Sequence, residues 1–172
     1  EQLTDVVNLS QSKDLKQHLC DLVKITEEAC TMLTPHANDK SITLTFDMSG
    51  KSFPVAGHKS YLYRAISGLI YNGIMYTPQQ SDVNVVLAFH SSGITLSVGD
   101  CGAAISEHDP AQVFENYGGG LRGTKVDSQL AIPIELTYAV VRAHDGTLMA
   151  ENQADGRLVF TMTLPSHMQV AE

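Results

Sequence analysis

Hydrophobic residues recur at helical spacing in several stretches of the chain, and residues that cap or interrupt helices bound each stretch. The expected helices run over 58–76, over 130–144 with Pro133 in the first turn, and from a cap at Ser12 or Asp14 to an end marked by Pro35 and Asn38. A proline is tolerated in a first turn because the N–H that it lacks has no partner there. Residues 1–10 carry a short amphipathic stripe, too short to be stable alone, that looks like the end of a preceding helix.

Alternating apolar and polar residues predict strands between and after these helices. The expected strands cover 41–48, 53–56, 82–90, 94–100, 147–151 and 158–164. Ser91, Ser92 and Gly93 have the composition of a hairpin turn, and polar residues 152–157 join the last two strands. The order of elements predicts an α+β, two-layer sandwich, with helices packed on one face of a mixed, mainly antiparallel sheet.

Composition and charge narrow the classes of protein to which the chain can belong. Its 172 residues suit one domain, and 19 acidic against 11 basic residues give a formal net charge of −8. The acidic balance argues against a general DNA- or RNA-binding module, but it allows a nucleotide ligand, since backbone N–H groups can bind phosphate. No apolar run reaches the ~18 residues of a membrane span. The wide spacing of Cys20, Cys30 and Cys101 indicates neither a disulfide framework nor a zinc site, which favours a reducing cytosol.

Two segments carry candidate chemistry. Asn72 lies about one turn before the end of the expected helix 58–76, where it is either a surface or capping residue or an oxygen ligand for Mg²⁺. Asp100 ends the expected strand 94–100, where its carboxylate either forms a turn or accepts a hydrogen bond from an exocyclic amine such as that of adenine. Gly102 would then let the backbone approach the base closely.

In this order, the segments resemble the catalytic and ATP-binding domain of sensor histidine kinases, a branch of the superfamily shared with gyrase, heat-shock and mismatch-repair ATPases. VAGHKSYLYRAISGLIYNGIMYTP resembles the asparagine box of that family, LSVGDCGAAI its first glycine box, VFENY its phenylalanine box, and VVRAHDGTLMAEN with LVFTMTLP its closing segments. The resemblance covers almost the whole chain and implies a Bergerat-type sandwich. It also implies that residues 1–12 end a preceding dimerisation helix and that residues 13–172 form the ATP-binding domain.

The resemblance implies roles for the residues that match the family's motifs. Asn72 is implied as the Mg²⁺ ligand, and Tyr76 as an aromatic neighbour of the adenine. Asp100 is implied as the carboxylate that binds the adenine amino group, and Gly102 as the close-approach glycine beside it. ATP and Mg²⁺ are therefore the implied cofactors. No catalytic residue is expected within the chain, because none of its histidines has the spacing of the family's phosphoacceptor.

Several positions depart from the family's motifs. Gly68 stands where the first asparagine of the asparagine box is usual, Met75 where a basic residue is common, and Ala104 in place of the second glycine of the first glycine box. Counting back from the closing segment places the second glycine box at 129–134, where all of its glycines are missing. In the family this box opens a helix whose N-terminal N–H groups hold the triphosphate. Side chains there would block close approach, so weakened nucleotide binding is expected.

The long connection over 101–128 holds the run Gly118-Gly119-Gly120 followed by Gly123. A connection of this length inside a domain is usually functional. One interpretation is a glycine-rich lid over the site, and the other is a substitute phosphate cradle in which Arg122 and Lys125 supply positive charge. The spacing to the next helix favours the lid.

Three functional hypotheses remain open. The first is the ATP-binding catalytic domain of a two-component sensor histidine kinase, which passes the γ-phosphate to a histidine on a separate dimerisation segment. The second is a degenerate, pseudokinase-like interaction or regulatory module that binds little or no ATP. The third is an adenine-nucleotide sensor without transfer. The resemblance implies, as partners, the dimerisation and phosphoacceptor domain of a homodimeric parent and a response regulator. It implies a cytoplasmic location without direct membrane contact, and no nucleic acid.

Overall fold

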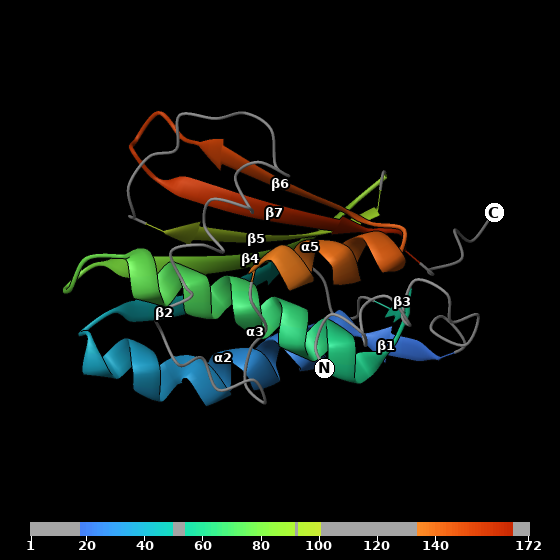
Figure 1. Ribbon diagram of the computed structural model, residues 1–172, viewed down its shortest axis with the longest axis horizontal. Helices are drawn as coiled ribbons and strands as arrows, with labels where there is room; N and C mark the ends of the chain where they lie inside the picture. The colour runs from blue at the N-terminus through green and yellow to red at the C-terminus, as the bar shows by residue number, and fades with distance from the viewer. Residues whose placement is uncertain (1–17, 50–53, 92, 101–133, 167–172) are drawn as a thin grey trace.

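The computed structural model describes residues 18–49, 54–91, 93–100 and 134–166. Within them, five strands form one mixed sheet, and three helices cover one of its faces (Figure 1). The helices are α2 (Leu22–Asp39), α3 (Lys59–Tyr76) and α5 (Ile134–Ala143). The strands of the sheet are β2 (Thr43–Ser49), β4 (Asp82–His90), β5 (Gly93–Asp100), β6 (Thr147–Asn152) and β7 (Leu158–Leu164). The expected α+β sandwich is confirmed.

The strands follow the order β2-β4-β5-β7-β6 across the sheet. β2 runs parallel to β4, and the chain between them includes α3, since a parallel pair needs a crossover. The other neighbouring pairs are antiparallel, and the expected hairpins β4–β5 and β6–β7 are both present. The prediction of a mixed, mainly antiparallel sheet is therefore confirmed.

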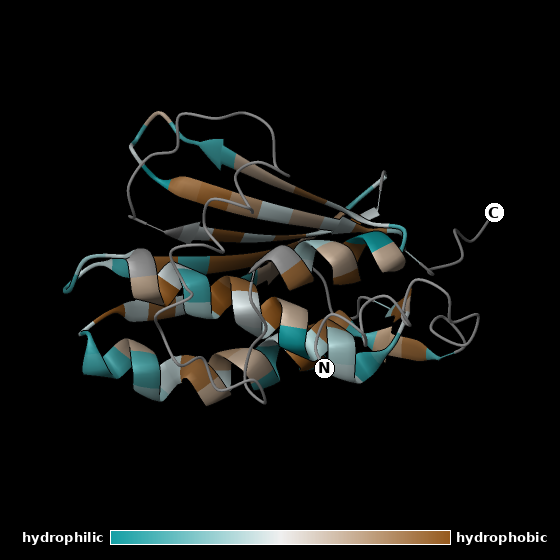
Figure 2. Cartoon of the chain, in the orientation of Figure 1, coloured by the Kyte–Doolittle hydropathy of each residue, from teal (hydrophilic) through white to brown (hydrophobic). Residues whose placement is uncertain are grey.

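The core lies between the helices and the sheet face that they cover. Val83, Val85 and Leu87 alternate along β4 and are fully buried, whereas Val86 between them is 40% exposed, as expected for a sheet covered on one side. Figure 2 shows apolar residues along the strands and polar residues in the turns that join them. The largest fully buried side chains are Phe160, Leu22, Ile25, Leu33, Leu62, Ile66, Leu69, Ile70, Ile74 and Leu87.

The expected start of the first long helix is wrong within the described residues. Leu19–Asp21 forms a short strand, β1, which pairs with β3 (Pro54–Ala56) in a separate two-stranded sheet. The Asp21 carboxylate then accepts a hydrogen bond from the backbone N–H of Val23 at 3.0 Å and caps α2. Pairing with β3 and this cap fix the boundary, and the earlier candidates Ser12 and Asp14 lie outside the described residues.

The expected end of this helix, marked by Pro35 and Asn38, is confirmed to within one residue of Asn38, because α2 ends at Asp39, but Pro35 lies inside the helix and does not interrupt it. Leu33 and Ala37 on either side of the proline are both buried in the core. Their packing outweighs the backbone hydrogen bond that the proline cannot donate. The expected helix 58–76 is confirmed as α3, and α5 confirms the last helix from Ile134 onward, with residues 130–133 outside the described part.

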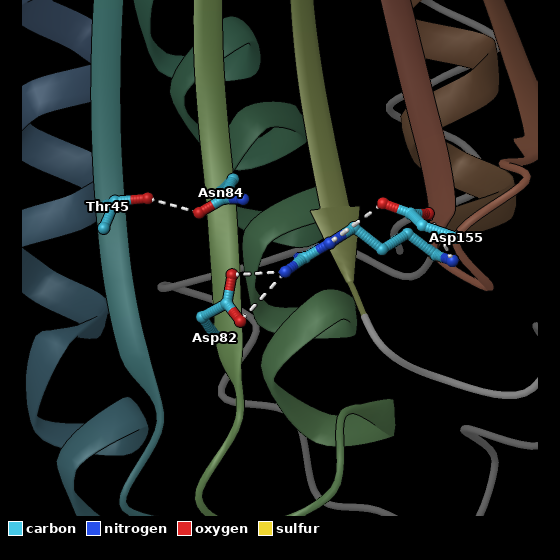
Figure 3. A network of polar contacts seen from close by, with 5 residues as sticks. Thr45, Asp82, Asn84 and Asp155 are labelled. Atoms are coloured by element: carbon cyan, nitrogen blue, oxygen red, sulfur yellow. Dashed lines mark hydrogen bonds and ion pairs between the residues drawn. The ribbon is translucent and has the colours of Figure 1, made fainter.

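An arginine just before β7 links the start of that strand to the start of β4. Arg157 lies just before β7 and bonds to Asp82 at the start of β4, although β5 lies between these two strands in the sheet. Asp82 and Asp155 are labelled in Figure 3. The Nη2 of Arg157 donates to both carboxylate oxygens of Asp82, at 2.9 and 2.7 Å, and its Nε lies 3.7 Å from Asp155 Oδ2. Thr45 and Asn84 join β2 to β4 on the same part of the sheet, through a hydrogen bond of 2.6 Å.

Replacing Arg157 with methionine is expected to lower the free energy of unfolding by about 1–2 kcal/mol. The Arg157 and Asp82 side chains are 25% and 38% exposed, so solvent screens part of their attraction. Urea unfolding followed by circular dichroism measures the loss. Arg142→Met removes an exposed arginine of α5 and serves as the matched control. Equal stability of the two variants would contradict a structural role for the Arg157–Asp82 pair.

Candidate functional site

The candidate site lies at the end of the molecule where α3 and β5 both end, on the left in Figure 1. The backbone of Asp100, the last residue of β5, pairs with Leu158, and that of Gly99 pairs with Asn84 near the start of β4. α3 ends at Tyr76, only a few residues before β4 begins at Asp82. The topology thus brings the last turns of α3 to the same end of the sheet as Asp100.

Asn72 is the most informative of the predicted site residues. It lies one turn before the end of α3 and is only 1% exposed. Neither its carboxamide oxygen nor its nitrogen has a hydrogen-bond partner in the part of the chain that the structure describes. A buried polar group without a partner costs about 1–3 kcal/mol of stability. The interpretation of Asn72 as a surface or capping residue is therefore wrong, and its carboxamide is available to a ligand.

The other predicted site residues are placed only in part. Tyr76 is the last residue of α3, one helical turn after Asn72, and Asp100 is the last residue of β5. Gly102, Arg122 and Lys125 lie outside the described residues. So do the first five positions of the expected second glycine box, whose last position, Ile134, begins α5.

A lysine that the sequence did not single out lies next to these residues. Lys40 follows α2, and its ammonium group donates hydrogen bonds to the backbone oxygens of Ile74, Met75 and Thr77, at 2.7, 2.9 and 2.9 Å. A helix leaves its last carbonyl groups without partners, so one ammonium group satisfies most of those at the end of α3. A lysine near the C-terminus of a helix often binds the last carbonyl groups of that same helix. Lys40 follows α2 but binds the last carbonyl groups of α3.

Comparison with known sequences decides the family. The sequence profile described as histidine kinase-, DNA gyrase B- and HSP90-like ATPase matches residues 57–168, which includes α3, β4, β5, α5, β6 and β7. The chain belongs to this family. The resemblance drawn from the asparagine and glycine boxes is thereby confirmed at the level of the family.

Relatives of this histidine kinase-like ATPase chain lie among sensor proteins. It is 25% identical over 131 residues to the heme sensor protein HssS of Staphylococcus aureus, an alignment that covers 76% of this chain and 28% of that protein. The fold is similar to that of the Acinetobacter baumannii histidine kinase AdeS, with a TM-score of 0.70, 17% identity, and 97% of this chain and 76% of that chain covered. Full-length ShkA in complex with AMPPNP gives a TM-score of 0.72 at 13% identity, covering 99% of this chain and 35% of that chain.

The opposite end of α3 in this ATPase-family chain is held by a buried histidine. His144, 3% exposed, follows α5, and its Nε2 accepts a hydrogen bond from the backbone N–H of His58 at 3.1 Å. Its Nδ1 lies 2.8 Å from the carbonyl oxygen of Val140, which can only accept, so Nδ1 carries the proton and the ring is neutral. Lys40 and His144 thus hold the two ends of α3 from other elements.

A concave region lies at that opposite end, around the starts of α2 and α3 and away from Asn72. It is a cavity of about 820 Å³ whose lining includes His18, Cys20, Lys24, His58 and Tyr63. Burial raises the pKa of the Cys20 thiol, which bonds to the carbonyl oxygen of Gly57 at 3.4 Å. Cys20 is therefore a packed side chain and not an activated nucleophile.

The described residues of this family member lack both a cluster of metal ligands and a membrane-spanning helix. They contain no group of three or more His, Cys, Asp or Glu side chains that could hold a metal ion. No helix among them is long and apolar enough to span a membrane. Asn72 therefore remains the candidate metal-binding residue that the structure describes best. A metal ion held by its carboxamide oxygen would take most of its other ligands from outside the described residues.

Proposed function

We propose that this chain is the ATP-binding catalytic domain of a two-component sensor histidine kinase. It would bind ATP with Mg²⁺ at the end where α3 and β5 end, and supply the γ-phosphate to a histidine on a separate dimerisation segment. The observation that carries the proposal is the Asn72 carboxamide, which is buried in α3 without a hydrogen-bond partner among the described residues. A protein retains such a group at a cost in stability, and a ligand that uses it accounts for the cost.

The Asn72 carboxamide suits Mg²⁺, because that ion takes oxygen ligands and keeps several positions for water and substrate phosphates. When bound, Mg²⁺ neutralises charge on the phosphates during phosphoryl transfer. Asn72 would hold the ion, Asp100 would accept a hydrogen bond from the adenine amino group, and Gly102 would allow close approach of the base. Tyr76 would lie beside the adenine.

Positive charge for the phosphates would come from Arg122 and Lys125 in the connection between β5 and α5. The solved complex of full-length ShkA with AMPPNP supports nucleotide binding in proteins of this fold. Nucleotide binding by this chain is proposed to be weak, because 129–134 lacks the glycines of the second glycine box and Met75 replaces a basic residue.

The second candidate is a degenerate, pseudokinase-like regulatory module that binds little or no ATP and acts through protein contacts. The same missing glycines favour it, whereas the unpartnered Asn72 favours a retained ligand.

In either case residues 1–12 would end the dimerisation helix, and residues 13–172 would form the domain. The partners would be the dimerisation and phosphoacceptor domain of a homodimeric, cytoplasmic or membrane-anchored parent and a response regulator. The chain spans 28% of the length of its relative HssS, which leaves room for such domains.

Titration of this chain with AMPPNP and Mg²⁺ by calorimetry tests the proposal. We expect a dissociation constant on the order of 0.1 mM, equivalent to about −5.5 kcal/mol. At about 5 mM nucleotide this affinity raises the free energy of unfolding by about 2.3 kcal/mol, which a thermal shift detects. Addition of EDTA and the substitution Asp100→Asn should each abolish the heat of binding. No heat and no thermal shift at that concentration would favour the regulatory module instead.

A further inference from the structure

Lys40 is placed where it can control the geometry of the candidate site. Its backbone closes α2, since its N–H donates to the carbonyl oxygen of Ala37 at 3.1 Å. Its side chain crosses to α3 and donates to the last carbonyl oxygens of that helix, at 2.7 to 2.9 Å. Burial lowers the pKa of the Lys40 ammonium group. One side chain therefore links the end of α2 to the last turn of α3.

The ammonium group matches the electrostatics of this helix end. The C-terminus of a helix carries a partial negative charge, because its last carbonyl groups point the same way and lack partners. No basic residue lies in the last turn of α3 itself. Three carbonyl oxygens around one ammonium group use all of its donors, so Lys40 is fixed in one position.

Two segments near the contact between Lys40 and α3 have strained backbone: the residue after Lys40 and the chain that follows α3. Ser41 and Gln80 have positive φ angles of 54° and 64°, in the left-handed region that side chains disfavour. The N–H of Gln80 donates to the carbonyl oxygen of Lys40 at 3.4 Å, and that of Thr43 donates to the carbonyl oxygen of Ser81 at 3.0 Å. Such strain persists where the surroundings hold the backbone firmly, and it is common at functional sites.

Asn72 depends on this contact because no polar group among the described residues holds its side chain. The described residues offer its carboxamide no hydrogen-bond partner, so its position is set by packing and by the backbone of α3 alone. Ile74 and Met75, whose carbonyl oxygens Lys40 binds, lie in the turn that follows Asn72. A loosened last turn would let the carboxamide move, and displacements of about 1 Å are enough to weaken a binding site substantially.

We propose that Lys40 is a positioning residue of the nucleotide site, which holds the last turn of α3 and with it Asn72. The inference rests on the proposed function of that end of the molecule. Lys40 need not touch the nucleotide, since it acts through the backbone of α3.

The test compares Lys40→Met with Lys59→Met in this chain. Lys59 begins α3 at its other end. Its side chain is 67% exposed and its Nζ lies 3.9 Å from Glu28 Oε2, so its removal controls for the loss of one lysine. Affinity for AMPPNP with Mg²⁺ is measured well below the unfolding temperature of each variant. At such temperatures both variants are folded, so replacing a residue that only stabilised the fold would leave the nucleotide affinity unchanged. We expect Lys40→Met to weaken binding by at least about fivefold relative to Lys59→Met, and a smaller difference would overturn the proposal.

Amide hydrogen exchange in the absence of nucleotide provides a second readout. The N–H of Thr77 bonds to Gly73 at the end of α3, and that of Leu62 bonds to His58 at its start. Lys40→Met should accelerate exchange at Thr77 by at least about tenfold more than at Leu62, because only the last turn loses its cap. Equal acceleration at both amides would overturn the positioning role. If the unmodified chain bound no nucleotide, the proposed function would fail, and exchange alone would decide whether Lys40 holds this turn.

Discussion

Replacing Asn72 with alanine should greatly weaken binding of AMPPNP with Mg²⁺ and at the same time stabilise the protein. The carboxamide is buried without a partner among the described residues, so its removal relieves a cost of about 1–3 kcal/mol, and alanine is a better helix former. After a small loss for the volume removed, we expect a gain of about 1 kcal/mol, or about 2–4 °C in melting temperature. Loss of the ligand oxygen should weaken nucleotide binding by about 100-fold, equivalent to 2.7 kcal/mol.

A matched control separates this effect from a general effect of losing an asparagine. Asn84 accepts a hydrogen bond of 2.6 Å from Thr45 on the sheet, so Asn84→Ala should lower stability and leave nucleotide affinity unchanged. Thermal unfolding and calorimetry on both variants provide the comparison. If Asn72→Ala bound nucleotide as the unmodified chain does, the Mg²⁺ role of Asn72 would be wrong. If it were destabilised by more than Asn84→Ala, the carboxamide would have a structural role instead.

Replacing His144 with alanine should produce the largest loss of stability, about 3 kcal/mol. The substitution empties a buried site that the imidazole fills, and it removes the acceptor for the His58 N–H at the start of α3. Chemical unfolding measures the loss. His36→Ala is the matched control, because His36 is half-buried and makes one edge-on ring contact with Tyr71, with centroids 5.7 Å apart. The role of His144 would be refuted by a loss no greater than that of the control.

Gly57 supplies a second test of the same contact. A Cβ atom at Gly57 would lie 2.7 Å from His144 Cδ2 and 2.9 Å from Leu62 Cδ1, so Gly57→Ala should cost about 1–3 kcal/mol. In the His144→Ala background the new methyl group can occupy vacated space. The two losses should therefore combine to less than their sum, and additivity would show that the ring and the glycine do not share this space.

The sequence predicted those elements whose patterns are local. The apolar stripe of α3 and the alternation of β4 and β5 were sufficient, because each element buries one continuous face. The start of α2 was missed because Leu19 fits the helical stripe of the residues that follow. In the structure it is 64% exposed, and the neighbouring Cys20 pairs with Val55, a partner far along the chain. Long-range strand pairing leaves no periodic signal in three residues.

The candidate site was predicted only in part, because some of its features depend on contacts between distant parts of the chain. The motif that contains Asn72 identified the family, but burial of Asn72 without a partner is a property of the packed structure and not of the motif. Lys40 has no motif of its own and looks like a solvated residue after a helix. Its role comes from carbonyl oxygens 34 to 37 positions away, which only the fold brings to it. His144 was seen only as part of the closing segment VVRAHDGTLMAEN, and in the structure the residue after it, Asp145, has a positive φ of 59°.

The order of strands in the sheet has a consequence for the chain while it is being synthesised. β7 lies between β5 and β6, although it leaves the ribosome after both of them. Until residues 158–164 emerge, the backbone groups of β5 that later pair from Ile94 to Asp100 face solvent along an unprotected edge. Such an edge can pair with another nascent chain. Truncation between β6 and β7 would leave this edge of β5 permanently exposed. Fragments that end there should therefore aggregate, whereas the chain that includes β7 should not, because β7 covers the edge.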